Sequence, residues 1–171
     1  MSNVNVPIVK TVNIKSQSQT TQNAITIDSS GRYYLNQKPC FNAKVSSATT
    51  RQYASGAVVD FLINASVNFP GGVYNTTSCR FTAPVSGYYY FFANFLKDGV
   101  TSQPIDWRIA VNGINIQGGY SSNYVFYTQA NGGCIVFLNT NDYVDIRSTY
   151  GNGIWWNDSV ASYWMGFLID F

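Results

Sequence analysis

The chain has 171 residues and a net charge of +2, and only 11% of its residues are charged, against about 25% in an average soluble protein. It contains eight Asp but no Glu and no His, and general acid–base catalysis, Ser-His-Asp triads, zinc-histidine sites and paired-glutamate sites depend on the missing side chains. The composition therefore argues against an enzyme, and the ten scattered Lys and Arg argue against a nucleic-acid or anionic-membrane binder.

Residues 1–37 are polar and contain few aromatics, as expected for an arm or stalk. Apolar residues alternate with others between residues 4 and 14, and the segments Ile25–Asp28 and Arg32–Leu35 flank a Ser-Ser-Gly turn. This pattern predicts a short strand, a turn and a short strand. Such an arm buries too little to fold alone, so it docks on another surface, trimerises as a stalk or is a disordered tail.

From residue 38 onward, strand signals come at short intervals between Gly, Asn and Pro turns. The clearest is Ile105–Val111, followed by Asn112-Gly113 and Ile114–Gln117, which predicts a hairpin with a type I′ turn. Many short strands, with Tyr, Phe and Trp abundant and Leu rare, predict an all-β sandwich or barrel. Further strands are expected at Val58–Ile63, Val125–Thr128, Cys134–Leu138, Tyr143–Arg147 and Tyr163–Ile169.

Two segments, Tyr88–Phe95 and Tyr163–Ile169, are apolar on both faces of the expected strand. An antiparallel strand in a lone sandwich buries one face and exposes the other to water, so these strands predict a second burial partner, supplied by self-association. The alternative is that the Tyr hydroxyls reach solvent at the rim. The residues expected to pack in the core or between copies are Tyr88, Tyr90, Phe91, Tyr163 and Phe167.

The cysteines Cys40, Cys79 and Cys134 are odd in number and lack the close pairing of zinc or redox motifs. We expect buried thiols that act as small hydrophobic residues. One disulfide with a leftover thiol is the alternative.

Several segments resemble, in order, the pattern of the C1q-like domain, which is related to tumour necrosis factor. The signature is Gly72–Asn75 followed by Phe81–Phe91, and the flanking matches are Pro39–Ala43, Val111–Gly113, Leu138–Val144 and Ser162–Ile169. The resemblance implies a ten-stranded jelly-roll sandwich that forms a tight homotrimer. The sequence departs from the pattern at Asn141, where Gly is usual, and at Cys79, near a position that is often Gly. It also lacks a collagen-like stalk, so complement-type or hormone-type biology is not implied.

The segment Ile25–Arg32, followed by Gln37-Lys38-Pro39 and Phe41-x-Ala43, resembles the junction before C1q-like domains in bacteriophage structural proteins, especially marine phage fibres. This resemblance implies a virion protein whose arm attaches it to capsid or tail proteins. The amino terminus has neither the basic start nor the apolar stretch of a secretory leader. The longest apolar stretch, Tyr88–Leu96, is also too short to cross a membrane as a helix.

Asp142 and Asp145 are the candidate ligands for calcium, which some C1q-like heads bind at the trimer apex. Their odd spacing places them on opposite faces of a strand, so ordinary turn and surface carboxylates are expected instead, with no cofactor.

The Gly- and Asn-rich segment Tyr150–Asp158 contains two adjacent Trp, which in a loop would present a flat apolar surface to a sugar ring. In a strand, one of the two Trp would point inward and pack structurally. A second aromatic loop is expected at Gly118–Tyr124. The candidate ligand contacts are Tyr120, Tyr124, Tyr150, Trp155, Trp156 and Asn157.

The sequence therefore predicts a non-enzymatic, trimeric C1q-like structural protein of a bacteriophage virion, with an arm at residues 1–37 and a head at residues 38–171. Its expected role is host-surface or glycan adhesion through three copies of one weak site. One alternative is a cellular, extracellular lectin or adhesin with the same fold. Another is a purely architectural capsid or tail decoration without a receptor.

Overall fold

The chain divides into two units, Met1–Lys38 and Pro39–Phe171, and each is considered by itself. The computed structural model describes residues 12–15, 23–27, 30, 33–35, 38–44, 49–60, 64–97, 104–121, 128–149, 153–157 and 161–170.

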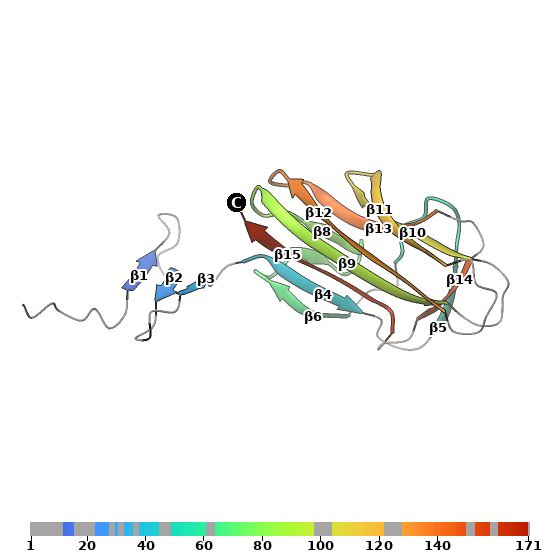
Figure 1. Cartoon of the computed structure of the whole chain (residues 1–171), viewed down its shortest axis with the longest axis horizontal. Coiled ribbons are helices and arrows are strands. Elements are labelled where there is room, and N and C mark those ends of the chain that lie inside the picture. The colour runs from blue at the N-terminus through green and yellow to red at the C-terminus, as the bar shows by residue number, and fades with distance from the viewer. Residues whose placement is uncertain are drawn as a thin grey trace, which may run out of the picture. The chain divides into compact units, whose positions relative to one another are not determined.

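The first unit contains a three-stranded antiparallel sheet in the order β1-β2-β3 (Figure 1). The strands are β1 (Val12–Lys15), β2 (Asn23–Ile27) and β3 (Tyr33–Leu35). The predicted strand, turn and strand are present as β2 and β3, and the alternation at Val12 and Ile14 forms β1. The predicted alternation at residues 4–8 lies outside the described residues.

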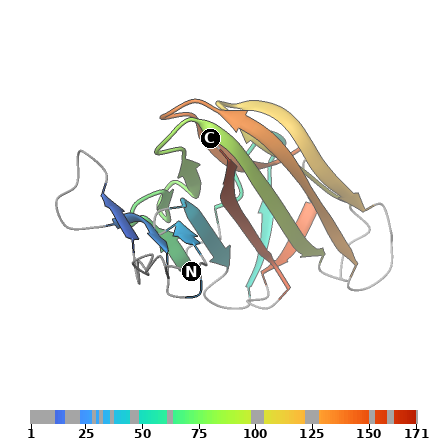
Figure 2. The same ribbon diagram turned by 60° about the vertical axis from the view of Figure 1, so that its left-hand side comes forward.

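The second unit is a sandwich of two antiparallel sheets (Figures 1 and 2). One sheet has the order β11-β10-β13-β8-β7. The other has the order β5-β14-β9-β15-β4-β6, with β12 paired to β9. The strands are β4 (Cys40–Lys44), β5 (Thr49–Tyr53), β6 (Asn64–Phe69), β7 (Tyr74–Asn75), β8 (Arg80–Thr82), β9 (Gly87–Lys97), β10 (Ile105–Val111), β11 (Ile114–Ser121), β12 (Gln129–Leu138), β13 (Tyr143–Ser148), β14 (Gly153–Asn157) and β15 (Tyr163–Asp170).

The all-β jelly roll predicted from the sequence is confirmed. Among the described residues, ten strands form two five-stranded layers, and the short strands β5 and β14 add to the layer that contains β9. β9 is central to this layer, because it pairs with β12 over ten residues on one side and with β15 on the other (Figure 2).

The hydrophobic core lies between the two sheets and is built on aromatic rings. Alternate residues of β9 are fully buried, among them Tyr89, Phe91 and Phe95. Phe91 packs on Phe81 of the opposite sheet with ring centroids 5.4 Å apart, and Phe95 packs on Trp107 at the same distance. Each fully buried aromatic side chain contributes roughly 1.5–3 kcal/mol to folding, so these contacts hold the two sheets together.

Three turns explain both the predicted hairpin and the departures from the C1q-like pattern. Asn112 and Gly113 have φ of 49° and 86°, and positive values at both positions confirm the type I′ turn between β10 and β11. Asn141 and Cys79 also have positive φ, at 73° and 52°. Glycine adopts this conformation without strain, and Asn tolerates it better than most other residues. The two departures therefore fall where the backbone favours Gly.

We expect Phe91→Ala to lower the free energy of unfolding by about 3 to 5 kcal/mol, because it opens a cavity between the sheets. The control is Ile114→Ala on β11, where the side chain is 71% exposed and a change within about 0.5 kcal/mol is expected. Urea unfolding at one fixed protein concentration measures both, and equal losses in the two variants would contradict this description of the core.

Candidate functional site: an aromatic face of the larger sheet

The outward face of β9 carries Tyr88, Tyr90 and Phe92, because the residues between them point into the core. Tyr88 is 50% exposed, although it lies in a long strand in the middle of the sheet. An antiparallel sheet that faces water normally alternates apolar and polar residues. β9 does not follow this rule over these positions.

The strands on both sides of β9 continue this apolar surface. On β12, Ile135 lies opposite Tyr90, and Phe137 lies opposite Tyr88 with ring centroids 5.2 Å apart. On β15, Phe167 lies opposite Tyr90 at 5.5 Å. We call this surface the aromatic face, and it comprises Tyr88, Tyr90, Phe92, Ile135, Phe137, Tyr163 and Phe167.

The apolar surface also reaches β4 and β6. Cys40 lies between Phe167 on one side and Phe69 on the other, and Val67 and Phe69 remain substantially exposed. Lys44 lies at the far end of β4. An exposed and contiguous apolar surface of this kind marks a contact site in a soluble protein.

The five residues predicted to pack in the core or between copies fall into two different environments. Phe91 is fully buried between the sheets, whereas Tyr88, Tyr90, Tyr163 and Phe167 belong to the aromatic face. Phe167 is 42% exposed in the single chain and is not a core residue.

Sequence reasoning missed the contribution of β12 to this face. Ile135 and Phe137 are 63% and 47% exposed. The signal is present in the sequence, because Cys134–Leu138 is apolar at every position, whereas Tyr88–Phe95 is interrupted by Asn94.

The residues predicted to contact a ligand are only partly described. Tyr120 lies on β11 with its side chain 59% exposed, whereas Tyr124 and Tyr150 lie outside the described residues. Trp155, Trp156 and Asn157 belong to β14, whose backbone pairs with β5 and with the end of β9. The expected loop is therefore a strand at these positions, because two neighbouring strands supply its backbone partners.

A charged network occupies the outward face of the other sheet. Asp145 on β13 is fully buried, and its carboxylate accepts hydrogen bonds from Arg80 Nε at 3.0 Å and from Arg147 Nε at 2.9 Å. Arg80 also stacks over the ring of Tyr143, 4.3 Å from its centroid. Beside this network, Arg108 lies opposite Arg147 and pairs with Asp106.

Two expectations about charge are corrected by this network. Arg80, Arg108 and Arg147 are distant in sequence but gather on one sheet, because β8, β13 and β10 are neighbours. Asp145 is not a surface carboxylate, since the two arginines compensate for its burial. Asp106 and Asp145 neutralise most of the added positive charge, so the network does not form the basic surface of a nucleic-acid binder.

Neither candidate calcium ligand presents a free carboxylate. Arg80 and Arg147 donate hydrogen bonds to the carboxylate of Asp145. Asp142 accepts hydrogen bonds from the Asn112 amide at 2.7 Å and from the Asn139 backbone N–H at 2.7 Å, and these bonds lower the pKa of Asp142. Within the described residues, no group of three His, Cys, Asp or Glu side chains is placed to hold a metal ion.

The three cysteines are free thiols. Only Cys79 is buried, whereas Cys40 and Cys134 are partly exposed, so the expectation of three buried thiols is wrong for two of them. Burial raises the pKa of Cys134 to about 11, which leaves it a poor nucleophile at neutral pH. The described part of the chain also contains no helix that is long and apolar enough to cross a membrane.

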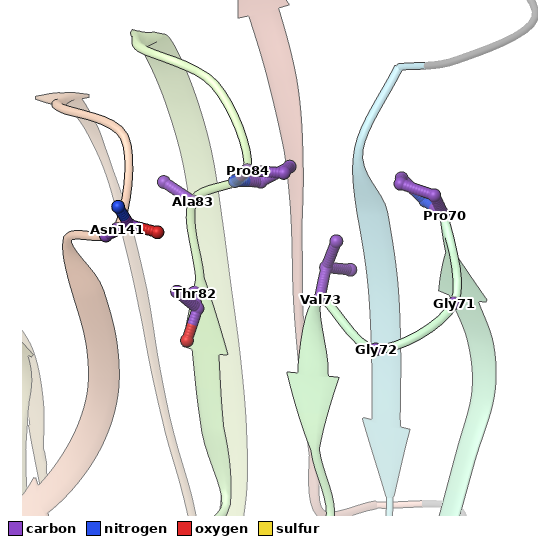
Figure 3. Close-up of a pocket in the computed structure, with 8 residues that line it drawn as sticks. All are labelled: Pro70, Gly71, Gly72, Val73, Thr82, Ala83, Pro84 and Asn141. Carbon is purple, nitrogen blue, oxygen red and sulfur yellow. The ribbon is translucent and has the colours of Figure 1, made fainter. Parts of the chain in front are cut away.

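A shallow hollow of about 240 Å³ lies at one end of the sandwich (Figure 3). This is smaller than the roughly 300–1,000 Å³ of typical ligand pockets. Backbone groups on its rim bond to each other, as in the Asn141 N–H donating to the Ala83 carbonyl at 2.8 Å. It has no titratable side chain and so offers no catalytic group; its lining is Pro70, Gly71, Gly72, Val73, Thr82, Ala83, Pro84 and Asn141.

Comparisons with known proteins give the same architecture. The sequence model of the C1q domain matches residues 40–169. The globular domain of zebrafish complement 1qA protein is 19% identical with a TM-score of 0.59, covering 77% of this chain and 98% of that chain. Eiger TNF from S. frugiperda is 14% identical with a TM-score of 0.59, covering 78% of this chain and 93% of that chain.

Murine APRIL is 9% identical with a TM-score of 0.58, covering 78% of this chain and 100% of that chain. At these identities, the similarity to solved structures shows the fold alone. A search of curated proteins found no match.

We expect Asp145→Asn to lower the free energy of unfolding by about 2 to 3 kcal/mol, because it removes charged hydrogen bonds and leaves two arginines facing each other. The loss stays below the roughly 3–5 kcal/mol of a fully buried pair, since the Arg80 side chain is 37% exposed and can turn to solvent. The control is Asp106→Asn, which breaks a partly exposed pair worth under about 1 kcal/mol. Urea unfolding measures both, and a smaller loss for Asp145→Asn than for Asp106→Asn would contradict the network's structural role.

Proposed function

Because the chain belongs to the C1q domain family, whose members are generally non-enzymatic, we propose that it is a homotrimeric structural protein of a bacteriophage virion. The aromatic face is the observation that supports the proposed trimer. Its side chains lie on the three neighbouring strands β12, β9 and β15, and in the single chain four of the seven are exposed and the other three are partly buried.

Self-association accounts for the aromatic face energetically. Full burial of one Phe, Ile or Leu side chain contributes roughly 1.5–3 kcal/mol relative to full exposure, and each copy offers several such side chains that are about half exposed. The seven residues of the aromatic face are uncharged, and the nearest charges lie at its margins, where Lys44 is opposite Tyr163 and Asp170 is opposite Tyr88. A ring of three copies closes the contact and leaves no free interface for further growth.

The virion role is supported by the first unit. The segment Ile25–Arg32 and the Gln37-Lys38-Pro39 junction resemble the lead-in of phage structural proteins, and the chain divides between Lys38 and Pro39. In this proposal, residues 1–37 bind capsid or tail proteins, and the head is displayed on the particle.

Adhesion of the displayed head to a host-surface glycan or protein follows from its trimeric form. Three copies of a weak site at fixed spacing raise avidity without a strong single contact. Tyr120 supplies one exposed aromatic ring per head on β11, and the remaining proposed contacts are Tyr124, Tyr150, Trp155, Trp156 and Asn157.

We expect Ile135→Asp to convert an assembly with the mass of three chains into single chains, because it places a charge within the aromatic face, opposite Tyr90. The matched control is Ile114→Asp on β11, where the wild-type side chain is 71% exposed, and it should leave the mass at three chains. Native mass spectrometry measures both. A wild-type mass other than three chains would refute the proposed trimer.

We expect the chain to be present in purified phage particles from its source at a fixed copy number, as found by quantitative mass spectrometry and by immunogold labelling of intact particles. A secreted but unincorporated protein would be recovered from particle-free medium instead. That outcome would replace the virion role with the cellular lectin or adhesin.

A further inference from the structure

The three strands of the first unit are aligned so that apolar residues lie opposite apolar residues. Val12 lies opposite Ile27, which in turn lies opposite Tyr33. In the next such row, Ile25 lies between Ile14 and Leu35. Residues two apart on a strand and residues directly opposite each other share a face of the sheet, so these six residues occupy one face.

The other face is more polar, with no aliphatic residue in its paired row. The row between the two apolar rows consists of Asn13, Thr26 and Tyr34. The sheet of β1, β2 and β3 is therefore amphipathic across its whole width, a pattern that the alternation along any one strand shows only in part.

A single amphipathic sheet needs a second layer against its apolar face. The described part of residues 1–38 consists of β1, β2, β3 and two residues outside them, and it contains neither a helix nor a second sheet. A sheet of only three short strands also gains little stability unless its apolar face is covered.

We propose that three copies of this sheet cover one another, with their apolar faces turned inward, and form a three-sided β-structured stalk. This inference rests on the proposed trimer of heads. In this proposal, the apolar face of each sheet packs against the same face of the sheets from two further copies of the chain.

The short connection between β3 and the head favours packing between copies of the sheet. Only five residue steps separate Leu35, the last residue of β3, from Cys40, the first residue of β4, and they span at most about 18 Å. β4 belongs to the sheet that carries the aromatic face, and Cys40 lies opposite Phe167 of that face. In a trimer that buries this face, the three connections begin close together, and short tethers give the three sheets a millimolar effective concentration.

The chemistry of the face also suits identical copies. Its six residues are uncharged and consist of aliphatic side chains and one Tyr. The sheet therefore meets its copies without charge repulsion, and the polar residues on this face are Tyr33 and, at the end of β2, Asn23.

The test is amide hydrogen exchange across Val12–Leu35 in the full chain. Ile25→Lys places a charge at the centre of the apolar face, and Thr26→Lys places the same charge on the polar face of the same strand. We expect both variants to keep the mass of three chains, with exchange of this segment at least tenfold faster in Ile25→Lys and unchanged in Thr26→Lys. A mass of three chains with unchanged exchange in Ile25→Lys would overturn the stalk and leave the head trimer intact.

The single-chain variant Ile135→Asp distinguishes copies from the chain's own head as the cover. We expect exchange of Val12–Leu35 to accelerate at least tenfold in this variant, while the amides of β9 remain protected and show that the head is folded. Retained protection of the segment would mean that its own chain covers the sheet, and would overturn the inference. A wild-type mass of one chain would instead refute the proposed trimer itself.

Discussion

The structure depends on one constraint, which is that β9 is apolar on both of its faces. Its inward residues, Phe91 among them, join the two sheets through aromatic contacts, and its outward residues join β12 and β15 into a continuous apolar surface. A sheet of this kind needs burial on both sides, because exposing apolar side chains to water is unfavourable in free energy. The fold of one copy and the proposed association of copies therefore depend on the same strand.

The charged residues follow the same division between the sheets. The aromatic face of the larger sheet has charges only at its margins, at Lys44 and Asp170. In contrast, five charged residues lie together on the smaller sheet: Arg80, Arg108, Arg147, Asp106 and Asp145. A buried carboxylate is tolerated there only because two guanidinium groups bond to it. With few charges in the whole chain, placing five of them on one face leaves the opposite face free for apolar contact.

Local features were predictable from the sequence, and features assembled by topology were not. The Asn112-Gly113 turn and the burial of Phe91 follow from residue type and alternation, which act over a few positions. The arginine network joins three strands that are distant in sequence, so no local pattern reveals it. The strand at Trp155 and Trp156 likewise arises from partners on β5 and β9, which override a sequence rich in Gly and Asn. For the candidate ligand contacts, Tyr120 is the residue whose exposed side chain the structure describes.

The short connection between Leu35 and Cys40 bears on which part of the proposed trimer associates first. A three-stranded sheet with one apolar face associates weakly when its copies are free in solution, because the cost of bringing them together exceeds what a small face repays. In the proposed trimer, the heads have the larger apolar surface and meet first, and the tether then turns association of the sheets into a nearly intramolecular step. In this proposal the head does more than display a contact surface, because its trimer also supplies the local concentration at which the proposed stalk folds.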